Sequence, residues 1–181
     1  MIKLKEMISR SLFTESKNLR IFDFDDTLVK TKSFIYITHK DGKKSKLTPA
    51  QYAIYNERPG DQFDFSDFEQ VKQPEEIKKI TSVLRRVVQS STEPVYILTA
   101  RSAADPIKQY LKDIGINSNK INVIALASNN PKDKADWIEG MIDNSGYDDI
   151  YFADDSQKNV DAAKQMLRRK DVKWRVQHIK H

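Results

Sequence analysis

The stretch NLRIFDFDDTLVKTKS, from Asn18 to Ser33, decides how the fold of this chain is interpreted. Its first part, Leu19–Phe24, is rich in β-forming apolar residues and predicts a strand. Three carboxylates, those of Asp23, Asp25 and Asp26, lie where this strand is expected to end. Two carboxylates about 4 Å apart repel one another by roughly 4 kcal/mol near a protein surface, so this crowding requires a compensating partner.

The composition describes a globular chain of 181 residues, which suits one domain with a sizeable core and a small insertion. With 39% hydrophobic and 31% charged residues it is not a disordered sequence. Its longest apolar stretches, such as Val123 to Ala127, are too short for a membrane span, so we expect no membrane association. The absence of cysteine excludes disulfides and thiolate metal sites and favours a cytoplasmic location. The net charge of +5 only slightly favours a polyanionic partner.

Strand and helix patterns alternate along the chain, which predicts an α/β fold with a central parallel sheet covered on both faces. We expect Pro74 in the first turn of one helix, Ser102 and Asp105 as an N-cap pair of the next, and Gly115 at its end. The predicted strands are Leu19–Phe24, Val95–Thr99, Ile121–Leu126, Ile150–Ala153 and Val172–Gln177.

The segment from about 30 to 73 interrupts this alternation and is too long for a plain connection. It begins with a predicted β-hairpin around Asp41 and Gly42, followed by a short helix that Thr48 caps and Pro49 starts. Its three phenylalanines are expected to anchor a long loop, with a substrate-stacking surface as the alternative; they are Phe63, Phe65 and Phe68. We expect residues 1–18 to form an N-terminal helical appendage and residues 19–181 to form the domain.

The polar residues of interest follow the predicted strands. Because ligands bind at the carboxyl ends of the strands in open parallel sheets, we expect these residues to meet at one edge. They are Asp23, Asp25 and Asp26 after the first strand, Thr99 and Arg101 after the second, Lys132 and Lys134 after the third, and Asp154 and Asp155 after the fourth.

This set of residues indicates phosphoryl transfer assisted by a divalent cation. Ligands that are all oxygen suit Mg²⁺, which would turn the repulsion among the carboxylates into attraction. Asp23 is the candidate nucleophile, and Asp25 would share its face if the extended geometry continued and would exchange a proton with the leaving oxygen. Thr99 and nearby backbone N–H groups would hold the phosphate oxygens, and a lysine would offset the developing charge.

Each element also has a structural interpretation. Asp26 is expected to shape a turn, the pair Asp154 and Asp155 is typical of helix capping, and isolated lysines such as Lys132 and Lys134 are usually solvated. The functional interpretation is favoured because all of these residues occur together, in order, at strand ends.

In these motifs the chain resembles the phosphatases of the haloacid dehalogenase (HAD) superfamily. The first motif is matched by Asp23, Asp25 and Thr27, the second by Thr99, the third by Lys134 with Lys132 as a competitor, and the fourth by Asp154 and Asp155. The resemblance implies a Rossmann-like three-layer sandwich with strand order 5-4-1-2-3 and a small cap. It also implies that Asp23 and Asp155 bind Mg²⁺ through side chains, Asp25 through its carbonyl, and that Asp154 supports them.

The tripeptide Thr99–Arg101 further resembles polynucleotide 3′-phosphatases, which would make Arg101, with Thr27 and Lys132, a substrate-binding residue. Several motifs also resemble small phage-encoded members of the superfamily, which would place the protein in the host cytoplasm. The basic C-terminal segment, with Arg168, Arg169, Lys170, Lys173 and Arg175, is as consistent with a nucleic-acid contact as with a solvated surface. A nucleotidase or other small-molecule phosphatase, and a non-catalytic interaction module, are the alternatives.

Overall fold

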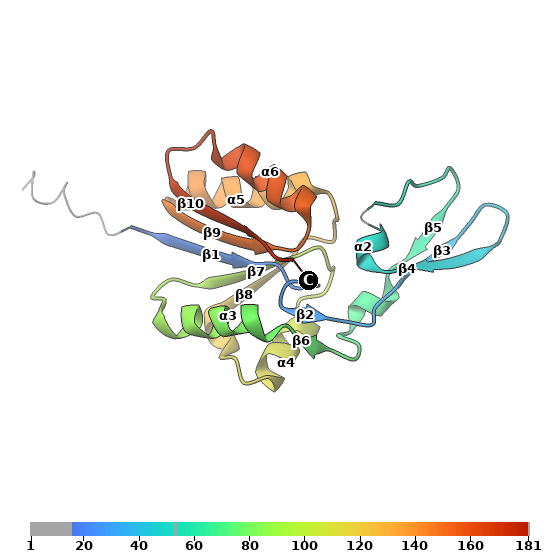
Figure 1. Cartoon of the computed structure of the whole chain (residues 1–181), viewed down its shortest axis with the longest axis horizontal. Helices are drawn as coiled ribbons and strands as arrows, with labels where there is room; N and C mark the ends of the chain where they lie inside the picture. The colour runs from blue at the N-terminus through green and yellow to red at the C-terminus, as the bar shows by residue number, and fades with distance from the viewer. Residues whose placement is uncertain (1–15, 53, 181) are drawn as a thin grey trace, which may run out of the picture.

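A five-stranded parallel sheet forms the centre of the molecule (Figure 1). The computed structural model describes residues 16–52 and 54–180. The strand order confirms the α/β class and the predicted 5-4-1-2-3 arrangement. From one edge of the sheet to the other, the strands are β10 (Lys173–His178), β9 (Asp149–Asp154), β1 (Asn18–Phe22), β7 (Val95–Thr99) and β8 (Ile121–Ala125).

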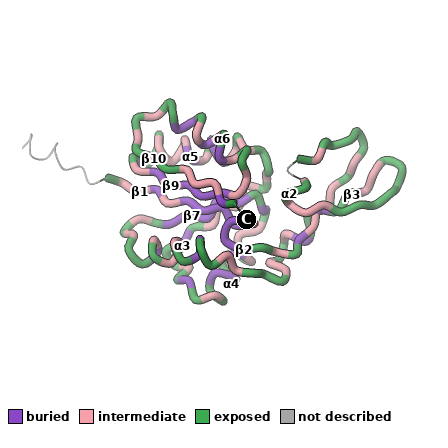
Figure 2. Tube along the Cα trace, viewed as in Figure 1, coloured by how far each residue is buried: buried purple, intermediate pink, exposed green. Residues whose placement is uncertain are grey.

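Two pairs of helices cover the two faces of this sheet, as three layers require (Figure 1). Alternate residues of β1 serve the two faces, because successive side chains of a strand point in opposite directions. Leu19 and Ile21 pack in one buried cluster, and Phe22 packs in the other. The central strands are correspondingly buried along much of their length (Figure 2). The first cluster lies under α5 (Pro131–Ser145) and α6 (Gln157–Leu167), and the second lies over α3 (Lys78–Ser90) and α4 (Asp105–Asp113).

Several predicted boundaries are wrong, each for a local reason. Pro74 is not in a helix, because residues Glu75–Glu76 form the short strand β6 and α3 begins only at Lys78. Ala104, and not Ser102, occupies the N-cap of α4, and no side chain caps that end. Gly115 ends α4 as predicted, with a positive φ of 75° and its N–H bound to the carbonyl of Lys112.

The insertion is a small antiparallel unit on two short connecting strands. β2 (Val29–Lys30) pairs with β6 at its base. The predicted hairpin is confirmed as β3 (Ile35–Thr38) and β4 (Lys44–Leu47), and β5 (Gln62–Asp64) completes the sheet in the order β4-β3-β5. A 3₁₀ turn, η1 (Ser66–Glu69), follows β5, and another, η2 (Ser118–Lys120), precedes β8 in the core.

The predicted helix of the insertion is also confirmed as α2 (Pro49–Tyr52). Thr48 caps it reciprocally: its Oγ1 accepts from the N–H of Gln51 at 3.2 Å, and its own N–H donates to Gln51 Oε1 at 2.9 Å.

The aromatic residues of the insertion pack mainly against one another. The Tyr52 ring meets the rings of Phe63 and Phe65 edge to face, with both pairs of centroids 5.4 Å apart. Phe65 nevertheless remains 45% exposed. The predicted anchoring therefore describes the contacts of Phe63, whereas Phe65 combines a packing contact with an exposed aromatic surface.

Of the predicted N-terminal helical appendage, 1–18, residues 1–15 lie outside the described residues, and its predicted end is wrong because Asn18 is the first residue of β1. Ser16 and Lys17 lead into β1, and both bind the Asp148 carboxylate, which precedes β9. None of the helices in the described ranges combines the length and apolar character that crossing a membrane requires.

Candidate active site

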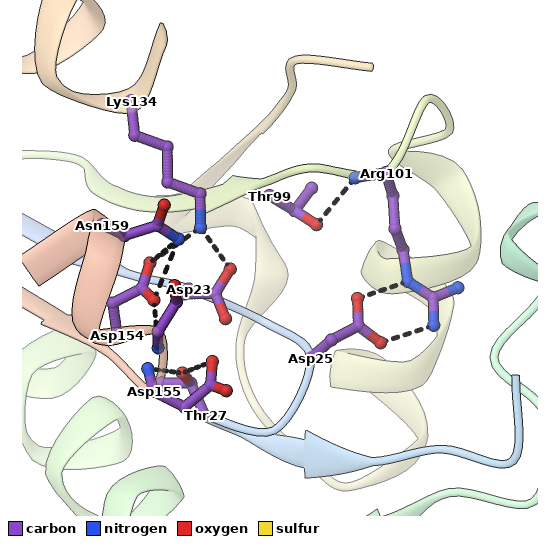
Figure 3. A network of polar contacts seen from close by, with 10 residues as sticks. Asp23, Asp25, Thr27, Thr99, Arg101, Lys134, Asp154, Asp155 and Asn159 are labelled. Carbon is purple, nitrogen blue, oxygen red and sulfur yellow. Dashed lines mark hydrogen bonds and ion pairs between the residues drawn. The ribbon is translucent and has the colours of Figure 1, made fainter. Parts of the chain in front are cut away.

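The carboxyl ends of β1 and β9 bring the central acids of the candidate site together. Beyond the last residue of β1, the N–H of Asp23 still donates to the carbonyl of Ala153 at 2.9 Å, which fixes Asp23 beside β9. Its side chain is buried, as is that of Asp154 at the end of β9. Lys134 Nζ lies between them, 2.6 Å from Asp23 Oδ1 and 2.8 Å from Asp154 Oδ2 (Figure 3).

Lys134 reaches this position because of the way α5 begins. Asn130 caps the helix by accepting from the N–H of Lys132, and Pro131 starts it, so Lys134 lies in the opening turn next to the sheet edge. The Nζ of Lys132 binds Asp136 on the outer surface of the same helix, and the Lys132 side chain is 73% exposed. Of the two competing lysines, Lys134 is therefore the one that contacts the acids.

Three carboxylates form a compact cluster at this edge. Asp23, Asp154 and Asp155 each offer an oxygen, and these oxygens lie within 4.8 Å of one another. Burial raises the pKa of Asp23 well above its usual range, with Lys134 opposing and the two other aspartates adding to the shift. Burial, followed by the charge of Asp154, also raises the pKa of Asp155 to about 7. Crowded, buried oxygens of this kind fit a divalent cation that prefers oxygen ligands.

The lysine is the cationic counterpart of this cluster. Burial alone would lower the pKa of Lys134, but the neighbouring Asp154 and Asp23 carboxylates outweigh it and raise the pKa. Lys134 is therefore charged at neutral pH, and its single ammonium is shared by Asp23 and Asp154. A further cation would favour the ionised form of the acids whose pKa values are raised.

Further residues hold the cluster in place. Thr27 Oγ1 accepts from the N–H of Asp155 at 3.0 Å, so Thr27 braces the end of β9 from the first motif. The amide of Asn159 donates to both oxygens of Asp154, at 3.0 and 3.1 Å, and His178 Nε2 donates to the carbonyl of Asp155 at 2.8 Å. Asn159 and His178 were missed from the sequence. The only available signal for Asn159 was its place in the first turn of the helix after the acidic pair.

Asp25 does not lie on the same face as Asp23. The condition for a shared face, that the extended geometry continues to Asp25, is not met, because β1 ends at Phe22 and Asp25 forms an isolated bridge to Val29. Its carboxylate points toward Arg101 instead (Figure 3), with Arg101 Nε 2.8 Å from Oδ2 and Nη2 2.7 Å from Oδ1. Asp26, with a φ of 56°, makes the tight turn that was expected of it.

Thr99 lies at the end of β7, between the Asp23–Lys134 pair and Arg101 (Figure 3). Its side chain is buried, and its Oγ1 accepts from the N–H of Arg101 at 3.2 Å. In the insertion, α2 lies opposite the loop before α5 (Figure 1), and its Tyr52 side chain comes close to Asn129 of that loop. The insertion thus contacts Arg101 of the core and also approaches it near Asn129.

Comparison with solved structures finds a similar fold. The chain is similar to the HAD domain of the effector protein Lem4 from Legionella pneumophila, solved as an inactive mutant. The two are 15% identical with a TM-score of 0.58, and the match covers 92% of this chain and 87% of that chain. This likeness shows that the chain has the fold of a HAD domain. No family model matches the chain, and no match is found among curated proteins.

Proposed function

We propose that this protein is a phosphatase that hydrolyses a phosphomonoester through a phosphorylated Asp23. The observation that carries the proposal is the buried Asp23 carboxylate at the sheet edge, in contact with Lys134 and grouped with Asp154 and Asp155. A carboxylate surrounded by like charges is costly to keep unless it serves a bound cation or a reaction.

Each residue has a defined part in this reaction. An oxygen of Asp23 forms a bond to phosphorus while the bond from phosphorus to the leaving oxygen breaks, and Asp25, which enters this step in its protonated form, gives that oxygen its proton. Asp25 then removes a proton from the water that displaces Asp23 from phosphorus, which restores both carboxyl groups. The Lys134 ammonium, which contacts Asp23, and the Thr99 hydroxyl at the end of β7 would bind the phosphoryl oxygens.

The acidic cluster also fits the expected metal. Asp23 and Asp155 would hold Mg²⁺ through their side chains and Asp25 through its carbonyl, with Asp154 in support. When bound, the ion would offset the negative charge that otherwise keeps a carboxylate away from a phosphate.

Among substrates, the ends of nucleic acids are the finer proposal, with a nucleotide or another small phosphate ester as the alternative. The support is a basic hairpin in the insertion, where Lys40, Lys43 and Lys44 are exposed. The basic C-terminal segment adds little: Lys173 pairs with Asp149 at the opposite end of β9, and Lys170 is ion-paired with acids of α5.

A phosphate-release assay tests both the proposed phosphatase activity and the proposed substrate. The substrates are a generic aryl phosphate and a 3′-phosphorylated oligonucleotide, each with Mg²⁺ or with a chelator, and Asp23→Asn is the control. We expect Mg²⁺-dependent release that is lost in the variant. Preference for the oligonucleotide, weakening as salt increases, would support the nucleic-acid substrate. Turnover of the aryl phosphate alone would favour a small molecule, and no turnover of either would favour a non-catalytic module.

A further inference from the structure

The Arg101 guanidinium is fully occupied within the protein. Two of its N–H groups bind the carboxylate of Asp25, and Nη1 binds the carbonyls of Phe68 at 3.0 Å and Gln70 at 2.7 Å. Nη2 also lies 3.4 Å from the Thr31 hydroxyl. An arginine has five N–H donors, so this conformation leaves none for a substrate phosphate.

The surroundings of Arg101 hold it in this position. Its side chain is 1% exposed. The guanidinium carbon lies 5.4 Å from the ring centroid of Phe24 and 4.9 Å from that of Phe68. A planar, buried and bidentate contact of this kind fixes the orientation of the carboxylate as well as its charge, which a lysine in the same place would not do.

The contacts also connect separate parts of the chain. Arg101 follows β7 of the core, Asp25 belongs to the first motif, and Phe68 and Gln70 lie where the insertion returns toward β6. The Thr31 hydroxyl, where the insertion departs, is 3.4 Å from both Asp25 Oδ1 and Arg101 Nη2. Both ends of the insertion therefore meet at one guanidinium, and that guanidinium holds the Asp25 carboxylate.

We propose that Arg101 is a positioning residue: it places the Asp25 carboxylate for proton transfer to the leaving oxygen and ties that placement to the position of the insertion. This rests on the proposed phosphatase function. It differs from the expectation that Arg101 contacts the substrate phosphate, since a substrate contact acts on binding, whereas positioning of Asp25 acts on the step in which the leaving oxygen is protonated. A shift of the 68–70 segment would move Arg101, and Asp25 would move with it.

The kinetic test is a double-mutant cycle with Arg101→Lys and Asp25→Ala, measured on aryl phosphates whose leaving groups range from poor to good. Arg101→Lys keeps the charge and loses the planar fork. We expect it to lower kcat/KM, which reports the phosphorylation step, about 10- to 100-fold for the poorest leaving group and by less than about threefold for the best. In the Asp25→Ala background it should have almost no further effect, because the group that it positions is gone.

Two further variants keep the test decisive. Arg20→Lys is the matched control, since Arg20 binds Asp149 at 2.8 Å at the far end of the sheet, and it should leave the leaving-group dependence unchanged. If Arg101→Lys does not fold, Thr31→Val removes only a hydroxyl of the same network and should give the same pattern in weaker form. A rise in KM with unchanged kcat, equal for all leaving groups and persisting without Asp25, would overturn the proposal in favour of a substrate contact.

Hydrogen exchange separates this proposal from the phosphatase function on which it rests. Asp25→Ala should speed the exchange of backbone amides in residues 66–72, because it removes the partner that holds Arg101 against their carbonyls. The measurement needs no turnover. Unchanged exchange in this segment would overturn the link to the insertion. If the exchange is faster in Asp25→Ala but the unchanged protein releases no phosphate, the link between Asp25 and the insertion is retained and the catalytic role is rejected.

Discussion

Two sets of buried carboxylates in this chain have opposite electrostatics. In the insertion, the pKa of Asp67 is lowered: Lys72 binds its carboxylate, and the N–H of Phe34 and the hydroxyl of Tyr36 donate to it at 3.1 and 3.2 Å. At the sheet edge, burial and neighbouring acids raise the pKa values of Asp23 and Asp155.

The difference separates an acid whose charge is satisfied within the fold from acids whose charge is not. The protein surrounds Asp67 with donors, so its negative charge is satisfied within the fold and ties η1 to β3. At the sheet edge one ammonium binds both Asp23 and Asp154, so the charge of the grouped carboxylates stays unfavourable without a further cation. Substitutions at Asp67 and at the sheet-edge acids should therefore have different effects.

The largest effect is expected for Asp23→Asn. The amide has nearly the same shape but cannot attack phosphorus, so phosphate release should fall by at least about ten-thousandfold while the protein stays folded. Steady-state assays and circular dichroism would measure the two properties. Activity within tenfold of the unchanged protein would reject Asp23 as the nucleophile.

The next largest effect is expected when Lys134, the cation that Asp23 and Asp154 share, is replaced. Lys134→Met leaves Asp23 and Asp154 buried without their ammonium partner, so the free energy of unfolding should fall by about 3–5 kcal/mol. Lys132→Met is the control, because Lys132 is exposed on the same helix. In denaturant titrations this variant should have the same free energy of unfolding as the unchanged protein. Equal effects of the two substitutions would contradict the placement of Lys134 at the acids.

Magnesium should stabilise the sheet edge without any substrate. A cation at one hundred times its dissociation constant should raise the free energy of unfolding by about 2.7 kcal/mol. Asp155→Asn should remove most of this gain, whereas Asp67→Asn should retain it, since Asp67 lies in the insertion. Thermal unfolding with and without Mg²⁺ measures the gain, and an unaltered gain in Asp155→Asn would argue against the site.

Asp67→Asn should destabilise the protein without affecting the chemistry. The amide keeps part of the hydrogen bonding but loses the ion pair and the charged acceptor, so we expect a loss of about 1–3 kcal/mol in the free energy of unfolding. The kcat/KM for an aryl phosphate with a good leaving group, which depends little on the placement of Asp25, should change by less than about twofold. A large loss of this kcat/KM at full stability would place Asp67 among the functional acids and break the distinction.

The smallest effect is expected in the pH dependence of the stability that Asp67 contributes. Because folding lowers the pKa of Asp67 below its usual 3.8, its contribution is fully present above that value and is lost as pH falls through the lower pKa of the folded state. The difference in stability between the unchanged protein and Asp67→Asn should therefore shrink below about pH 4 in urea titrations. A difference that grows with acidity would contradict the lowered pKa.

Much of the fold was predictable because its signals are local. β7 follows its predicted boundaries, and Gly115 and Thr48 act as the terminators and caps that their residue types indicate. Pro74 and Ser102 were misplaced, since both lie next to residues that pair or pack with distant segments. Local preferences do not report such contacts.

The site was predictable only in part. The position of an acid at a strand end places Asp23 and Asp154 at one edge, and the structure brings them to Lys134. The orientation of Asp25 was not predictable, because it depends on where β1 ends and on Arg101, which is 76 residues away in the sequence. Asn159 was missed for a similar reason, since its role depends on the direction of its side chain from α6.

The most direct test of the account is to look for phosphate on Asp23 during turnover. The protein, with Mg²⁺ and an aryl phosphate, is quenched in acid and digested, and the peptides are examined by mass spectrometry. The Asp25→Ala variant, which should lose the adduct slowly, is examined in parallel. We predict a phosphate adduct on the peptide that contains Asp23, which chelator and Asp23→Asn both abolish. Turnover with no adduct in either protein, or with an adduct on another residue, would contradict the account.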